Sequence, residues 1–361
     1  MFELKITPQD ENRRLDKFLF MYLKNAPHSL VYKLLRKKRI KLNGKRAAGG
    51  ELLQDGDGIG FYLSQETLAG LRMERETGLS KDLEIVIARS KATKQSKVCD
   101  NLGLLRRFAP RNDGAVTLRY NSNDGQDDFA INIIFEDENL LIINKPAGIP
   151  SHGGMKSKTP HLLARTLYYL RETGAYPPDA TFVPALCNRL DVNTSGLVIC
   201  GKNYQAIRAA NALFSSSGHI TKEYIAVVDG ELFGSATLEG HYQKDTAVNK
   251  ARITNAPHAP RAITAYKSIS PSEGRTLLSI NPITGRSHQI RAHMAAIGHP
   301  LAGDKKYGSK PNRSSQGYLL HCNKLILGKP ILNYPIGTTW SAEPPEYFTR
   351  QVRAWFGDIN I

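Results

Sequence analysis

Cysteine is scarce in this sequence of 361 residues, and the spacing of the few that occur argues against two kinds of site. The four stand far apart and form no Cys-x-x-Cys pair: Cys99, Cys187, Cys200 and Cys322. Zinc sites usually present paired ligands at short spacing, and disulfide-stabilised domains carry many more cysteines. We therefore expect no disulfide framework and no bound metal, and the composition favours a reducing cytoplasm.

Long hydrophobic runs and glycine-rich phosphate-binding motifs are also missing. No apolar stretch is long enough to span a bilayer and no leader is evident, so we expect no membrane partner. Neither a P-loop nor a dinucleotide-binding glycine pattern occurs, so we expect a reaction that needs no cofactor.

Acidic residues are few relative to basic ones. The chain has 49 Lys and Arg against 33 Asp and Glu, which gives a net charge of +16. Such an excess favours a polyanionic partner, with nucleic acid first and an anionic membrane second. The alternative is that the charge merely reflects a basic proteome.

The cations are concentrated in a compact N-terminal unit, residues 12–63. Leu15, Phe18, Leu19 and Leu23 recur at helical spacing, and Ser29 is a plausible N-cap for a second helix. A strand then enters an Asn-Gly turn at Asn43. This unit resembles an S4 domain, a small RNA-binding fold. The resemblance implies that its RNA-binding face is formed by Lys33, Arg36, Lys37 and Arg39, with a solvated basic face as the alternative.

Residues 64–129 have a different composition and form a predicted linker. The stretch 89–97 is polar and basic, and 104–114 has neither a helical nor a strand period. Its core resembles a translated mobile palindromic repeat, which would be tolerated where loop closure costs little. A basic tether that adds contacts to RNA is the other interpretation.

The stretch 188–197 holds the best candidate for a catalytic group. Apolar strands are predicted before it, at 182–186, and after it, at 197–200, so Asp191 falls at a strand-to-turn junction. Gly196 is free to adopt a positive φ in that turn. A single carboxylate beside Arg189 suits a nucleophile kept ionised by a cation, although a strand-end Asp that caps its own turn is the simpler interpretation.

The sequence of this stretch resembles the signature of the RluA-type pseudouridine synthases, His-Arg-Leu-Asp-x-x-Thr-Ser-Gly. The chain departs from it at the first position, which is Asn188. The Lys-Pro-x-Gly segment from Lys145 continues the resemblance, and the His-Gly-Gly run from His152 together with the S4-like unit favours the RluC-like branch. In this family the Asp of the signature is the nucleophile, which implies that role for Asp191.

Two further segments carry implied site residues. Lys-x-Tyr at 222–224 resembles the family's Tyr motif, so Tyr224 would stack on the flipped uracil. In 283–293 Gly285 is expected to end a strand and Arg286 to lie at the start of a helix. The resemblance implies that Arg286 pairs with Asp191, with Arg291 as the second choice. Arg189 would fill the stack that the flipped base leaves.

The implied fold is α/β (α+β): a small S4 domain plus a catalytic domain, residues 130–350, with a mixed, mainly antiparallel sheet. The implied activity is isomerisation of uridine to pseudouridine in 23S ribosomal RNA by a monomer that needs no protein partner. Two alternatives remain at this stage. One is a synthase for other 23S sites or for tRNA, and the other is a non-catalytic RNA-binding assembly factor, which Asn188 favours.

Overall fold

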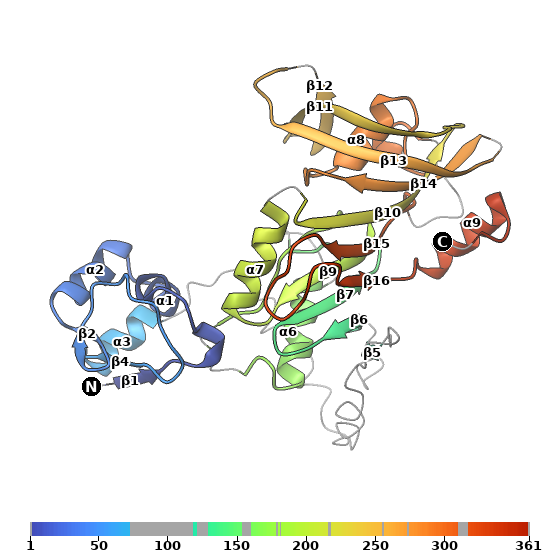
Figure 1. The fold of residues 1–361 in the computed structure, drawn as a ribbon. Coiled ribbons are helices and arrows are strands. Elements are labelled where there is room, and N and C mark those ends of the chain that lie inside the picture. Colours follow the sequence, from blue (N-terminus) through green and yellow to red (C-terminus); the bar gives the residue numbers. More distant parts are fainter. Residues whose placement is uncertain are drawn as a thin grey trace.

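The chain forms a small N-terminal domain and a larger domain built on one extended sheet (Figure 1). The computed structural model describes residues 2–72, 118–120, 129–153, 160–177, 180, 182–215, 218–254, 256–272, 274–309 and 317–359. Most of the predicted linker and its insert lies outside these residues, so the interpretation of that segment stays a prediction.

The small domain packs helices against a four-stranded sheet of order β1-β4-β2-β3. Its strands are β1 (Phe2–Lys5), β2 (Ile40–Leu42), β3 (Lys45–Arg46) and β4 (Gly58–Phe61), and its helices are η1 (Pro8–Asp10), α1 (Leu15–Tyr22), α2 (His28–Arg36) and α3 (Gln65–Arg72). The apolar residues at helical spacing form the core, as predicted, since Leu15, Phe18, Leu19 and Leu23 are fully buried.

Two details of this domain differ from the prediction. Helix α2 begins at His28 with Pro27 in the N-cap position, so the prediction of Ser29 as N-cap is wrong. Proline is suited to a helix start because its missing N–H would have no partner there. The core also includes Ile6 and Leu68, so the domain extends beyond 12–63 at both ends.

The larger domain contains a twelve-stranded sheet whose described pairs are antiparallel apart from β9 with β15, which confirms the predicted mixed sheet. From one edge to the other the order is β12 (Lys250–Thr254), β11 (Ser235–Asp245), β13 (Arg261–Ser272), β14 (Arg275–Pro282), β10 (Ile220–Asp229), β15 (Leu320–Leu327), β9 (Ser195–Gly201), β7 (Leu140–Lys145), β6 (Ile131–Glu136) and β5 (Leu118–Tyr120). Off this path, β16 (Thr339–Ser341) pairs with β15, and β8 (Ala185–Leu186) pairs with β9.

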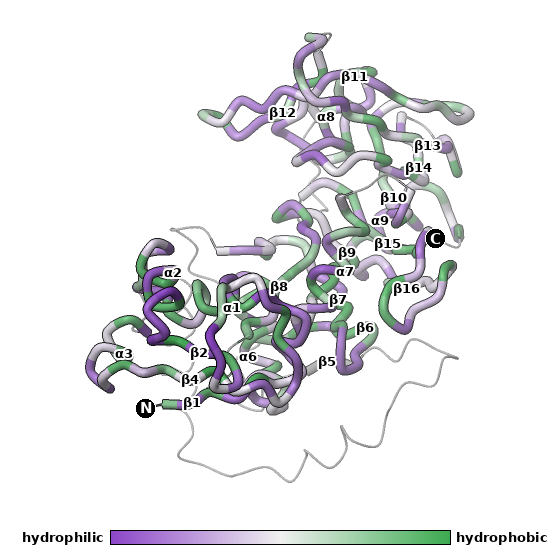
Figure 2. The backbone as a smooth tube through the Cα atoms, turned by 60° about the vertical axis from the view of Figure 1, so that its left-hand side comes forward, coloured by the Kyte–Doolittle hydropathy of each residue, from purple (hydrophilic) through white to green (hydrophobic). Residues whose placement is uncertain are grey.

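The core lies at the centre of this sheet, where β7 and β9 are apolar on both faces. The accompanying helices are α6 (Leu162–Glu172), α7 (Tyr204–Ser215), α8 (Gln289–Ala296), η3 (Lys305–Tyr307) and α9 (Glu346–Phe356). Helix α7 packs on β9, and α8 packs on β12, β13 and β14. Figure 2 shows hydrophobic stretches in the central strands and hydrophilic ones along β11 and β12.

Strand β9 needs a glycine at its second residue. Gly196 has φ +116°, and a Cβ there would lie 2.3 Å from the carbonyl oxygen of Cys322 in the adjacent β15. Only glycine allows both this backbone conformation and this approach. The predicted positive φ is confirmed, and its consequence is that the turn carrying Asp191 enters the centre of the sheet directly.

The two domains meet through Arg13. Its guanidinium donates to Asp10 Oδ1 at 2.8 Å and lies 4.3 Å from the ring centroid of Tyr204 at the start of α7. Both members of the Arg13–Asp10 pair are buried. Across the same contact, Gln205 Nε2 donates to Glu11 Oε2 at 3.4 Å. The small domain is therefore held against the helix that packs on β9.

Candidate active site

Asp191 lies in the turn between β8 and β9. Its carbonyl accepts from the N–H of Thr194 at 3.0 Å, which closes the turn, and its side chain is 24% exposed. The predicted strand-to-turn junction is therefore present, although the strand before it is shorter than 182–186 and covers only β8. The carboxylate is supported by protein on one side and open to solvent on the other.

Arg291, in the first turn of α8, is the cation that contacts Asp191. Its Nη1 donates to Asp191 Oδ2 at 3.2 Å. Its Nε and Nη2 bind Asp304 in a bidentate pair at 2.7 and 3.0 Å, and the guanidinium lies 4.4 Å from the ring centroid of Tyr318. Burial opposes the charge, but the hydrogen bonds and charge of Asp304 outweigh it and raise the pKa of Arg291. The guanidinium is thus a fixed positive charge beside the carboxylate.

The prediction that Arg286 pairs with Asp191 is wrong. Helix α8 begins at Gln289, not at Arg286, so Arg286 belongs to the turn before the helix and its side chain is exposed. Gln289 fixes that turn, because its Oε1 accepts from the N–H of Arg286 at 3.0 Å and from Thr284 Oγ1 at 2.7 Å. Within the described residues the basic side chains within 4 Å of the Asp191 carboxylate are those of Arg291 and His288.

His288 is the second basic group at the carboxylate. Its Nε2 lies 3.7 Å from Asp191 Oδ2, and its Nδ1 lies 3.1 Å from the hydroxyl of Tyr307. The backbone is left-handed, with φ 56° and ψ 17°, a conformation that costs a non-glycine residue about 1–2 kcal/mol. Burial, together with the charges of Arg291, Lys306 and Lys244, lowers the pKa of His288, while the charge of Asp191 opposes this.

Tyr224 lies in β10, between Cys322 of β15 and Ile280 of β14. Burial raises its pKa far above the ordinary value, and the charge of Asp191 adds to that effect. The phenol is therefore protonated at neutral pH and lies within electrostatic reach of the carboxylate. Two of the three residues predicted to be catalytic, Asp191 and Tyr224, thus lie near each other, and Arg291 occupies the position beside Asp191 that was predicted for Arg286.

Lys145 is a buried cation beneath the same site. It ends β7, its side chain is fully buried, and its Nζ donates to the carbonyl oxygens of Pro146, Ile149 and Val192 at 2.8, 2.8 and 3.1 Å. Three acceptors match the three donors of an ammonium group. Burial lowers its pKa to about 7, and the charge of Asp191 opposes the shift. Lys145 ties the Lys-Pro-x-Gly segment to the turn that carries Asp191.

Asn188, the departure from the family signature, has a defined structural role. Its Oδ1 accepts from the N–H of Ile199 at 2.8 Å and its Nδ2 donates to the carbonyl of Leu197 at 3.2 Å. The side chain thus pairs with β9 as a strand residue would, directly before the nucleophile turn. It points to the sheet and not to the carboxylate, so its presence does not imply a lost catalytic group.

The residues predicted to bind RNA are all on the surface. Arg189 is exposed beside His152, whose pKa is lowered by burial and by the charge of Arg189. The four cations of α2 and the turn after it are exposed as well, and they lie in the other domain: Lys33, Arg36, Lys37 and Arg39. Their exposure is compatible with RNA binding, which stays a prediction.

Sequence reasoning did not assign roles to several groups around Asp191. Three of these groups lie in segments that continue the family resemblance: Lys145, His288 and Asp304. The sequence motifs include these residues but do not reveal which side chains they contact. The one signal available for Lys145 was its place at the end of the apolar run 140–143. Among the described residues, none of the helices is both long and apolar enough to cross a membrane, and no cluster of three potential metal ligands occurs.

Comparison with known proteins gives related sequences over most of the chain. The family model for RNA pseudouridylate synthases matches residues 139–296. A ribosomal large subunit pseudouridine synthase C of Vibrio vulnificus (strain CMCP6) is 30% identical over 311 residues, which cover 85% of this chain and 81% of that protein. The Rickettsia bellii (strain RML369-C) protein of the same name is 29% identical over 342 residues, covering 93% of this chain and 96% of that protein. The solved structure of human RNA pseudouridylate synthase domain containing 4 has a TM-score of 0.49 at 23% identity and covers 61% of this chain and 91% of that one.

Proposed function

Because this chain belongs to the RNA pseudouridine synthases, we propose that it isomerises specific uridines of 23S ribosomal RNA, with Asp191 as the nucleophile. The choice of RNA is supported by the relatives named for the ribosomal large subunit and by the net charge of +16. We further propose that the enzyme acts in the cytoplasm as a monomer, without a required protein partner, metal or cofactor.

The observation that carries the proposal is the pairing of a partly exposed carboxylate with a buried, fixed guanidinium. Arg291 cannot turn away from Asp191, because Asp304 and Tyr318 hold its other atoms. It therefore keeps one carboxylate oxygen occupied and leaves the other available for attack. Such pre-organisation lowers the cost of reaching the transition state.

The reaction exchanges one bond to the ribose for another. The bond from N1 of uracil to C1′ breaks, the base turns, and C5 bonds to C1′; the proton on C5 is lost and N1 gains one. The base must leave its stack first, which costs a few kcal/mol. In this proposal Tyr224 contacts the flipped base and Arg189 fills the space that the base leaves in the stack. Asp191 attacks as the nucleophile, either on the sugar or on the base.

His288 and Lys145 complete the proposed site as positioning residues. The neutral imidazole of His288 limits the rotation of the carboxylate without neutralising it. Lys145 holds the backbone of the nucleophile turn through the carbonyl of Val192. Arg286 is left to contact RNA from its exposed turn.

The test is an Asp191→Asn variant, which keeps the size and shape of the side chain and removes the nucleophile. We expect release of tritium from 5-³H-uridine in 23S RNA transcripts to fall by several orders of magnitude, while RNA binding is no weaker, because a negative charge has been removed. The exposed Asp55→Asn serves as the matched control and should retain full turnover.

Pseudouridine mapping of ribosomal RNA and tRNA, with and without the gene, then separates the alternatives. Loss of pseudouridine sites from 23S RNA would support the proposal, and loss of sites only from tRNA would identify tRNA as the substrate instead. If no site is lost while the protein still binds RNA, the chain is a binding protein and not a catalyst.

A further inference from the structure

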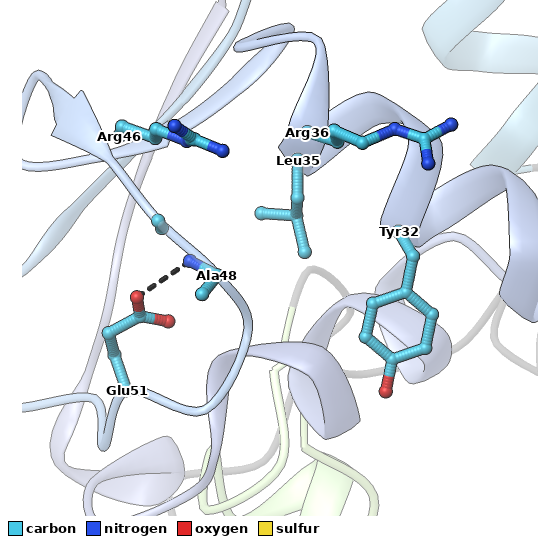
Figure 3. A pocket seen from close by; sticks show the side chains of 7 residues that line it. Tyr32, Leu35, Arg36, Arg46, Ala48 and Glu51 are labelled. Atoms are coloured by element: carbon cyan, nitrogen blue, oxygen red, sulfur yellow. Dashed lines mark hydrogen bonds between the residues drawn. The ribbon is translucent and has the colours of Figure 1, made fainter.

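The small domain contains a pocket that the catalytic reaction does not use. It has a volume of about 340 Å³ and lies between α2 and the loop after β3. Its lining is formed by Tyr32, Leu35, Arg36, Arg46, Ala47, Ala48 and Glu51 (Figure 3). Small-ligand pockets typically measure about 300–1,000 Å³, so the space suits a ligand of modest size.

Tyr32 gives the pocket an exposed aromatic ring that is held in place. Tyr32 is 45% exposed, although its hydroxyl donates to Asp16 Oδ2 at 2.9 Å and its ring makes an edge-to-face contact with Phe20 at a centroid distance of 5.6 Å. Asp16 is itself fixed by Arg14 at 2.7 Å and by the N–H of Lys17 at 2.8 Å. A ring held by these contacts loses little entropy when a planar group stacks on it.

The opposite wall is a rigid loop. Both carboxylate oxygens of Glu51 accept backbone N–H groups, from Ala48 and Gly49, at 2.7 Å each, and Figure 3 shows the first of these bonds. Gly49 has φ +103°, and a Cβ there would lie 3.1 Å from Asp16 Cβ and 3.3 Å from Leu35 Cδ1. The glycine thus lets the loop lie close to the helices, and the loop amides occupy the one acidic group of the lining.

Two guanidiniums supply the charge. Arg36 comes from α2 and Arg46 from β3, and both are exposed. Within the part of the chain that the structure describes, neither forms an ion pair. With Glu51 engaged by the loop, the pocket offers a π surface, the apolar side chain of Leu35 and two unpaired cations.

We propose that this pocket binds one unpaired nucleotide of the RNA substrate, with the base stacked on Tyr32 and the flanking phosphates at Arg36 and Arg46. The inference rests on the proposed function and deepens it. A duplex presents its phosphates but not the face of a base, so only a single-stranded or bulged nucleotide uses all of these groups. The four cations expected from the sequence would then bind the backbone around this point.

The test uses the full-length chain and two RNA hairpins whose strands are joined by a polyethylene glycol linker, so that neither has loop nucleotides. One hairpin is blunt and the other carries an unpaired tail, and both are titrated by fluorescence anisotropy. Stacking on an aromatic side chain is worth about 1–3 kcal/mol per base, so Tyr32→Leu should weaken binding of the tailed hairpin about 5- to 150-fold. Binding of the blunt hairpin should not change. Tyr62→Leu is the matched control, because Tyr62 belongs to the same domain, contacts Lys41 and does not line the pocket.

The charged side chains are tested by salt dependence. Arg46→Gln and Arg36→Gln should each reduce the slope of log K against log salt by about 1 for the tailed hairpin. An equal loss for both hairpins in Tyr32→Leu, or no loss for either, would overturn the proposal.

A crosslinking measurement on the unaltered protein covers the case in which Tyr32→Leu fails to fold. With 5-iodouridine in the unpaired tail, irradiation should give an adduct on the peptide that contains Tyr32, and adducts confined to other peptides would reject the subsite. The outcome is separable from that of the proposed function, because Asp191→Asn should lose turnover and still bind the tailed hairpin more tightly than the blunt one.

Discussion

At the scale of single residues, the site depends on which arginine reaches the nucleophile. Arg286 and Arg291 stand five positions apart, yet one is exposed in a turn and the other is buried in α8 with three polar contacts. Two carboxylates share the buried guanidinium, and one of them, Asp304, is itself almost completely buried. Arg291 therefore stabilises the fold and the nucleophile through the same group.

The same substitution should have different effects on the single-turnover rate at the two arginines. Arg291→Lys should lower the single-turnover rate about a hundredfold or more, because lysine cannot contact Asp304 twice and Asp191 once in a fixed geometry. Arg286→Lys should leave that rate little changed. Rapid-quench measurement of pseudouridine formation at saturating RNA compares them directly. Equal losses in both variants would restore Arg286 as the partner of Asp191.

At the scale of secondary-structure elements, the junction of β9 with β15 is stabilised by a buried histidine. His321 Nδ1 lies 2.9 Å from Ser195 Oγ, and its Nε2 lies 2.9 Å from the carbonyl oxygen of Ala342, beyond β16. Because a carbonyl only accepts, Nε2 carries the proton and Nδ1 accepts from the serine. Burial lowers the pKa of His321 to about 4, although the bond to Ala342 opposes the shift.

This arrangement predicts that acid destabilises the fold. Unfolded histidines bind protons near pH 6.5, whereas His321 stays neutral until about pH 4, and burial lowers the pKa of His293 in α8 to about 4 as well. Between these values the unfolded state binds more protons, so stability is present above pH 6.5 and is lost as the pH falls to 4. The loss approaches about 3 kcal/mol for His321 and is smaller for His293, which is less deeply buried.

Urea unfolding at several pH values between 7.5 and 4 measures this dependence. A His321→Gln variant is the control: it is less stable at pH 7.5, but it lacks one titrating group, so its stability should change less with pH. Identical pH dependence in the variant and the unaltered protein would show that His321 does not contribute.

At the scale of the whole molecule, the basic middle segment connects two domains that already contact each other. The described chain stops in α3, where Arg72 lies 4.6 Å from the ring centroid of Tyr22, and resumes in β5, which pairs with β6. In Figure 1 these two elements lie on different domains and well apart. The contact of Arg13 with Tyr204 holds the domains together independently of this connection.

Replacement of residues 73–117 by about 25 Gly and Ser residues should leave folding and turnover almost unchanged. A flexible chain of about that length spans on average about 25–30 Å, and the contact between the domains does not depend on the composition of the linker. The measurements are thermal unfolding and pseudouridine formation, each compared with the full chain. Loss of RNA affinity at unchanged stability would instead show that the basic segment contributes to binding.

The sequence by itself determined the local features. The turn before β9 follows from the order of apolar and turn residues around Asp191, and Gly196, the second residue of β9, has the predicted positive φ. The amphipathic helices of the small domain and the mainly antiparallel sheet also follow from periodicity and from the family resemblance. The turn and the helices depend on residues near one another along the chain, which is why a local pattern contains them, whereas the sheet pairs distant strands and was expected from the resemblance alone.

The tertiary structure alone decided which distant groups surround the nucleophile. Arg291 lies 100 positions from Asp191, and its selection over Arg286 depended on α8 beginning at Gln289. The buried Lys145 and the left-handed His288 are placed by strand pairing and by packing, which act between segments far apart in the sequence. If a helix begins a few residues earlier or later, a different arginine becomes the buried cation. No local sequence pattern determines the residue at which α8 begins.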